Sequence, residues 1–112
     1  MFTPSSRSGY DEARPGVRFR TLAHGARTLL AEFHLGKGAS LPRHAHPHEQ
    51  TGYLVGGALR FTIAGARFDA RPGDGWCIEG GVEHEVVAVE DSVVVEVFSP
   101  VRGDLLPAGG SA

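Results

Sequence analysis

Three histidines separated by single residues are the feature of this sequence best suited to chemistry. They are His44, His46 and His48, and Gln50 follows at the same spacing. Because successive side chains of a strand alternate between its faces, all four would share one face if this segment is extended. Neutral imidazole nitrogens with one or two oxygen ligands suit a divalent transition metal. The spacing therefore predicts a metal site, and the alternative is an exposed polar loop with histidines by chance.

The elements that must position these residues are predicted to be short strands. Alternating or β-branched apolar residues mark strands at 17–21, 27–35, 41–55, 59–63, 67–70, 76–78, 83–89 and 92–98. Glycine-containing turns separate them, and no window has a convincing helical period. Short strands at regular spacing predict an all-β sandwich or barrel. In this arrangement a later lone histidine, His84, lies on a different strand from the first three.

Length and charge limit the organisation and the partners. A chain of 112 residues fits one domain. We expect an N-terminal arm at 1–16 that is flexible or ordered by a partner, a barrel at 17–106 and a disordered tail at 107–112. The formal net charge is −2, and no basic run indicates nucleic acid or an anionic membrane. A small neutral or acidic ligand is compatible with this balance.

Cysteine usage and hydropathy bear on localisation. The single cysteine, Cys77, excludes an internal disulfide and suits a reducing compartment. The N-terminus lacks the apolar core of a signal peptide, and no apolar run is long enough to span a bilayer. We therefore expect a cytoplasmic protein that does not enter a membrane.

Two spacings of glycine and histidine resemble the paired motifs of the cupin family. The first comprises Gly38, His44, His46, Gln50 and Gly57, and the second comprises Gly73, Glu79, Gly81 and His84. The family usually has Glu, Pro and Asn where this chain has Gln50, Glu79 and Ala88. The resemblance implies an all-β double-stranded β-helix, a jelly-roll barrel of six to eight strands.

The same resemblance implies one divalent transition metal, which could be Zn, Ni, Mn, Fe or Co. Carried over by position, its ligands would be His44, His46, Gln50 and His84. A neutral glutamine in place of glutamate departs from the three-histidine, one-glutamate set of many cupin oxygenases. His48 fits no motif position, so it is a substrate contact, a partner of the ligands or an edge residue.

A second stretch is similar to one in the KdgF-like small cupins. Residues 96–102, Glu-Val-Phe-Ser-Pro-Val-Arg, resemble their Asp-x-Phe-Ser-Pro-x-Arg stretch, and 46–50 and 15–17 also match. The resemblance implies conversion of a cyclic unsaturated galacturonate into its linear keto form. In that reaction the acid, here Glu96, would act with Phe98 and Arg102. Glutamate in place of aspartate moves the carboxylate by about one bond length.

The residues themselves leave the roles of this stretch open. Glu96 lies among valines and shares a strand face with Phe98, but the alternation does not say whether that face is inside. If it is inside, Glu96 is a general acid or base, and otherwise it is a solvent-facing side chain. Likewise, Arg102 could hold a substrate carboxylate or lie in a loose tail.

Three functions follow from these features. The first is a metal-dependent enzyme acting on a small sugar acid, as the KdgF resemblance implies. The alternatives are a cupin dioxygenase and a non-catalytic module that binds a small molecule such as a sugar. Resemblance to cupins also implies a homodimer, with the N-terminal arm packed or exchanged between subunits.

Overall fold

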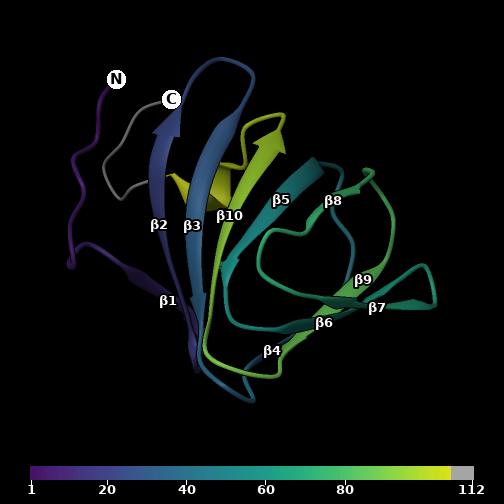
Figure 1. Ribbon diagram of the computed structural model, residues 1–112. Helices are drawn as coiled ribbons and strands as arrows, with labels where there is room; N and C mark the ends of the chain where they lie inside the picture. The colour runs from purple at the N-terminus through teal and green to yellow at the C-terminus, as the bar shows by residue number, and fades with distance from the viewer. Residues whose placement is uncertain (107–112) are drawn as a thin grey trace.

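Two antiparallel β-sheets face each other in the computed structural model, which describes residues 1–106 (Figure 1). This range contains ten strands and one 3-10 helix. They are β1 (Asp11–Arg14), β2 (Val17–His24), β3 (Leu29–Leu35), β4 (Ser40–His44), β5 (Glu49–Gly56), β6 (Leu59–Ile63), β7 (Ala66–Ala70), β8 (Gly75–Ile78), β9 (His84–Ala88), β10 (Ser92–Ser99) and η1 (Gly103–Leu105).

The strand order confirms the predicted all-β jelly-roll barrel. One sheet has the order β1-β2-β3-β10-β5-β8, and the other has the order β4-β9-β6-β7. Strands far apart in sequence are therefore neighbours, as where β10 pairs with both β3 and β5 (Figure 1). This crossing of the chain between sheets closes the barrel around one interior.

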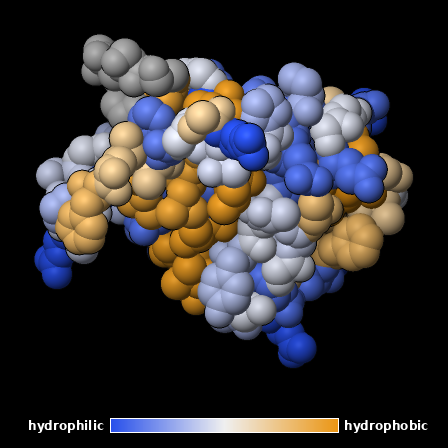
Figure 2. Space-filling view, turned by 90° about the horizontal axis from the view of Figure 1, so that it is seen from above, coloured by the Kyte–Doolittle hydropathy of each residue, from blue (hydrophilic) through white to orange (hydrophobic). Residues whose placement is uncertain are grey.

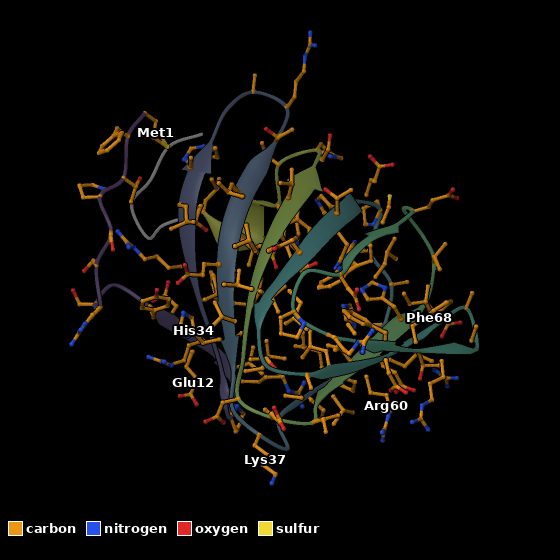
Figure 3. The ribbon with its side chains drawn as sticks, in the orientation of Figure 1. Met1, Glu12, His34, Lys37, Arg60 and Phe68 are labelled. Atoms are coloured by element: carbon orange, nitrogen blue, oxygen red, sulfur yellow. The ribbon has the colours of Figure 1, made fainter. Side chains whose placement is uncertain are left out.

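The core fills the space between the two sheets. Every second residue of β3, from Leu29 to Leu35, is buried, so its alternating pattern places one face inside. Leu54, Leu59 and Phe98 are among the largest fully buried side chains. Each contributes roughly 1.5–3 kcal/mol by leaving water. Residues of the opposite parity point outward, as Arg60 does on the four-stranded sheet (Figure 3).

Two features of the strand prediction were wrong. The single strand expected at 41–55 is two strands, because residues 45–48 leave β4 and carry the chain to β5 in the other sheet. An additional strand, β1, lies within residues 1–16 and pairs with β2. Its four side chains are all exposed, so it has no apolar alternation by which the sequence could reveal it. Residues 1–106 therefore contain ten strands rather than six to eight.

The N-terminal segment lies against the six-stranded sheet within its own chain. Arg20 of β2 donates a hydrogen bond to the carbonyl oxygen of Pro4 (2.8 Å), and Tyr10 donates one to Glu32 of β3. Whether a partner orders residues 1–16 stays a prediction. The predicted tail at 107–112 lies outside the described residues. Within residues 1–106, no helix has the length and apolar character needed to cross a membrane.

Candidate metal centre

Three of the predicted ligands meet at one end of the barrel. His44 ends β4 and His84 begins β9, and the register of these two strands places the two residues opposite each other. Their ring centres are 4.2 Å apart. His46 joins them from the connection between β4 and β5, and one ligand atom from each of the three lies within 4.8 Å of the others. His84 is about forty residues from the other two in the sequence, and the antiparallel pairing of β4 with β9 brings it to them.

Backbone carbonyls set the orientation of all three rings. The Nδ1 atoms of His44 and His84 lie 2.8 and 2.9 Å from the carbonyl oxygens of the residues two positions earlier. Nδ1 of His46 lies 3.0 Å from the carbonyl oxygen of His48. Each Nδ1 therefore donates its proton, which leaves Nε2 with a free lone pair. Metal-binding histidines are typically held in this way.

Burial also favours neutral imidazoles at this site. It lowers the pKa of both His46 and His84 from the usual histidine value, since the charged ring is poorly solvated there. The oxygen of Gln50 opposes this shift at His46, because it would accept a hydrogen bond from the protonated ring, and the nearby charge of Arg102 adds to the shift at both rings. Neutral rings are the form that binds a metal.

The connection at 45–48 is fixed by a close backbone contact. The N–H of Gly81 donates to the carbonyl oxygen of His46 at 2.8 Å. A Cβ atom on Gly80 would lie only 2.3 Å from the carbonyl oxygen of Pro47. Glycine at position 80 therefore lets the segment with His46 approach the turn before β9, which places His46 beside His84.

Gln50 supplies an oxygen beside the histidines. It is buried on β5, and its Oε1 atom lies 2.7 Å from Nε2 of His46. Its Nε2 atom donates to Oε2 of Glu96 at 2.6 Å, which orients the amide. Because His46 donates through Nδ1, two lone pairs face each other at this short distance. A divalent metal that accepts both lone pairs fits this arrangement and the rest of the donor set.

Glu96 faces the interior, on the same side of β10 as Phe98. Part of its surface opens into a cavity of about 300 Å³, although protein surrounds the carboxyl group itself. Burial raises the pKa of Glu96 to about 7, against the hydrogen bonds from Trp76 and Gln50 and the charge of Arg102, which lower it. Both hydrogen bonds go to Oε2, so within residues 1–106 Oε1 has no donor.

Arg102 and Phe98 complete the lining on the same side. The guanidinium carbon of Arg102 lies 4.8 Å from the centre of the Phe98 ring. The ring of Phe98 is also 6.1 Å from that of His46. Arg102, Glu96 and the rings of His44 and His84 line one cavity together. One small cavity thus combines Arg102, a cation that could bind a carboxylate, with Glu96, which could carry a proton, and with the candidate metal site.

Comparison with known proteins assigns the family. Residues 31–100 match the model of the cupin domain. The chain belongs to the cupin domain family. It is 28% identical over 99 residues to the pectin degradation protein KdgF of Dickeya dadantii, a match that covers 87% of this chain and 90% of that protein.

Solved cupin structures have the same fold. The structure of KdgF from Halomonas sp. has a TM-score of 0.89 and 30% identity, and the match covers 95% of this chain and 98% of that one. An RmlC-like cupin from Shewanella frigidimarina also has a TM-score of 0.89, with 24% identity over 94% and 95% of the two chains. The chain is therefore a KdgF-like cupin in sequence and fold.

The structure of this cupin places His48 beside the cluster rather than in it. Its ring centre is 5.6 Å from that of His46. Its carbonyl oxygen accepts the proton of His46, and its own Nδ1 is buried without a hydrogen-bond partner among the described residues. His48 thus acts on His46 through its backbone, which residue type and spacing could not indicate.

Two further residues belong to the site, although the sequence motifs do not include them. Nε1 of Trp76, on β8, lies 3.5 Å from Oε2 of Glu96. Asp104 in η1 forms an ion pair with Arg102. Alternation in β8 places Trp76 inside with Ile78, which is a usable signal. Asp104 follows the last strand and has no periodicity that could have identified it.

Proposed function

We propose that this cupin is a metal-dependent enzyme that converts a cyclic unsaturated uronate into its linear keto form. The proposal is supported by one observation above all. Glu96 and Arg102 line the same cavity as His44 and His84, two members of the cluster of three histidines. Likeness to two proteins named KdgF, one of them described as a pectin degradation protein, supports a sugar acid as the substrate class.

In this proposal His44, His46, Gln50 and His84 hold one divalent transition metal. Such an ion would supply Lewis acidity toward a substrate oxygen. Arg102 binds the substrate carboxylate through paired N–H donors. Phe98 packs under the guanidinium group and excludes water from that side of the cavity.

Glu96 moves the proton in this scheme. Opening of the ring leaves an enol, and the keto form arises when a proton reaches the neighbouring carbon. Oε2 of Glu96 is held by Gln50, whereas Oε1 has no protein donor in the described chain and can carry a proton toward the cavity. Glutamate in place of the aspartate of related sequences extends the carboxyl further from β10.

The assay that tests this function follows the ultraviolet absorbance of the unsaturated uronate. Metal-loaded protein should accelerate its loss over the spontaneous reaction, and Glu96→Gln should remove most of the acceleration, by about a hundredfold or more. Oxygen uptake measured in parallel distinguishes a dioxygenase. A wild-type protein that binds metal but leaves the spontaneous rate unchanged would overturn the proposal.

We also propose that the chain acts as a cytoplasmic homodimer. The outer face of the six-stranded sheet carries apolar side chains, and Figure 2 shows a broad hydrophobic patch on the molecular surface. By strand parity the outward residues include Leu30, Tyr53, Val55, Val93, Val95 and Val97. Tyr53 and Val55 are each about half exposed. Light scattering that gives a monomer mass at all concentrations would exclude the dimer.

A further inference from the structure

Asp104 holds Arg102 by one edge of its guanidinium group. Nε of Arg102 donates to Oδ1 of Asp104 at 3.1 Å, and Nη2 donates to Oδ2 at 2.7 Å. The same guanidinium lies over the ring of Phe98. Asp104 thus fixes an edge of the group, and Phe98 covers a face.

The remaining edge determines how a ligand can bind. A guanidinium offers a carboxylate two bidentate edges, one formed by Nε and one Nη atom and the other by the two Nη atoms. Asp104 occupies the first edge, so the second is the one left for a ligand in the cavity. A planar carboxylate matches two parallel N–H donors, whereas the hydroxymethyl group of a neutral sugar does not.

We propose that Asp104 is a positioning residue that presents the Nη1–Nη2 edge of Arg102 to the carboxylate of a uronic acid. This inference rests on the proposed function and deepens it, because it selects uronates over the corresponding neutral sugars. Asp104 also lines the cavity, but its carboxylate is held by Arg102, so it acts on the ligand through that side chain.

Exposure distinguishes this ion pair from the other arginine–aspartate pairs on the surface. The side chain of Arg102 is 20% exposed and that of Asp104 is 60% exposed. In contrast, Asp69 and its partners Arg60 and Arg67 are all between 45% and 59% exposed. Asp104 reaches inward to a largely buried arginine, whose charge also lowers the pKa values of His46, His84 and Glu96. Arg102, the ion-pair partner of Asp104, therefore belongs to the cavity.

Kinetics of the metal-loaded protein test the role of Asp104. Asp104→Ala frees Arg102 to rotate, so KM for the unsaturated uronate should rise about tenfold, the effect of one lost charge-assisted hydrogen bond. The turnover number kcat should change by less than about twofold, since Glu96 is untouched. Asp104→Asn keeps one acceptor and should give an intermediate KM. Asp69→Asn, which alters an exposed pair, is the matched control.

A fall in KM for Asp104→Ala, instead of the expected rise, would overturn the proposal. If Asp104 competes with the ligand for Arg102, its removal should lower KM rather than raise it. An unchanged KM in both variants would likewise show that Arg102 is oriented without Asp104. Thermal unfolding of each variant checks that the fold is retained, and the exposed position of Asp104 favours this.

A second measurement is independent of catalysis. The Nε–H resonance of Arg102, assigned by its loss in Arg102→Lys, should exchange with solvent about tenfold more slowly in the wild-type protein than in Asp104→Asn. Equal exchange rates would overturn the positioning role. Galacturonate should shift the Nη signals while leaving Nε–H in place, and galactose should shift neither. If galacturonate shifts nothing, the uronate assignment fails, while the exchange rates still decide the role of Asp104.

Discussion

Trp76 and Glu96 meet across Gly52. The three residues form one row on β8, β5 and β10, because Gly52 is paired with Trp76 on one side and with Glu96 on the other. A Cβ atom at position 52 would lie 2.4 Å from atoms of the indole ring. The absence of a side chain there lets the indole cross the middle strand and reach Oε2 of Glu96, at 3.5 Å. Contacts of this kind are often long without substrate and shorten in the complex.

Gly52→Ala should therefore separate Trp76 from Glu96. The ring must move to accommodate the methyl group, which we expect to cost about 1–3 kcal/mol of unfolding free energy. Because Trp76 is the single tryptophan of the chain, its fluorescence reports this displacement directly. Gly56→Ala on the same strand has no atom within 4 Å of the new methyl group and is the control. Unchanged emission and stability in Gly52→Ala would contradict this account.

Removal of one histidine should abolish metal binding. Elemental analysis of the purified wild-type protein should give about one equivalent of a divalent transition metal, and His46→Ala should reduce it to background. The reason is that the imidazole of His46 links His84 to Gln50. His24→Ala, which alters a histidine outside the cluster, should keep the metal. Stoichiometric metal in His46→Ala would show that the cluster is not the binding site.

The cluster of three histidines could be predicted largely from the sequence, but the orientation of its rings could not. Alternate residues from His44 to Gln50 are the more buried ones, as the strand pattern indicated, even though residues 45–48 are not a strand. The motif spacing placed His84 in the set, and β4–β9 pairing brings it there. The backbone acceptors for the three rings depend on local turns, which residue types alone do not determine.

The position of Glu96 required the structure. Its strand is rich in valine on both faces, so alternation alone allowed the Glu96 side chain to point either into the barrel or toward solvent. The pairing of β10 with both β3 and β5 puts it in the centre of the sheet, and the buried residues Val94 and Phe98 show which face is inside. Asp104 and β1 could not be predicted, because their exposed side chains leave no apolar pattern.

Gln50→Glu should make the stability of this cupin depend on metal. The amide donor 2.6 Å from Glu96 would become a second carboxylate, and two such groups cannot both be charged at this distance without cost. Metal-free Gln50→Glu should therefore unfold several degrees below the wild-type protein, as about 1 kcal/mol shifts Tm by about 4–8 °C in a small domain.

Added metal should offset that loss, because an anionic ligand strengthens binding of a dication. Thermal unfolding with a chelator measures the loss of stability without metal, and thermal unfolding with zinc measures its recovery. Gln50→Leu, which removes donor and acceptor together, should not gain the extra metal-dependent stability. Equal chelated Tm values for the wild type and Gln50→Glu would contradict the contact with Glu96.

The N-terminal segment should make the protein sensitive to acid. Tyr10 donates a hydrogen bond to Glu32, which His34 also contacts at 2.8 Å, and Figure 3 shows His34 beside β1. The hydrogen bond from Tyr10 is the largest influence on the pKa of Glu32 and lowers it, burial opposes this, and His34 and Arg20 add to it. A lowered pKa means that the folded state favours the charged carboxylate more than the unfolded state does.

This contribution is fully present above the unfolded pKa of about 4.5 and is lost as pH falls through the lower folded value. Tyr10→Phe removes the main donor, so the variant should be less stable near pH 6 by about 1 kcal/mol. Its disadvantage should shrink as pH falls below about 4.5 and through the lower folded pKa of Glu32, beneath which the carboxyl is protonated in both states. Urea unfolding at a series of pH values measures this difference. A constant deficit at every pH would show that Tyr10 stabilises the sheet by packing alone, through its contact with His34.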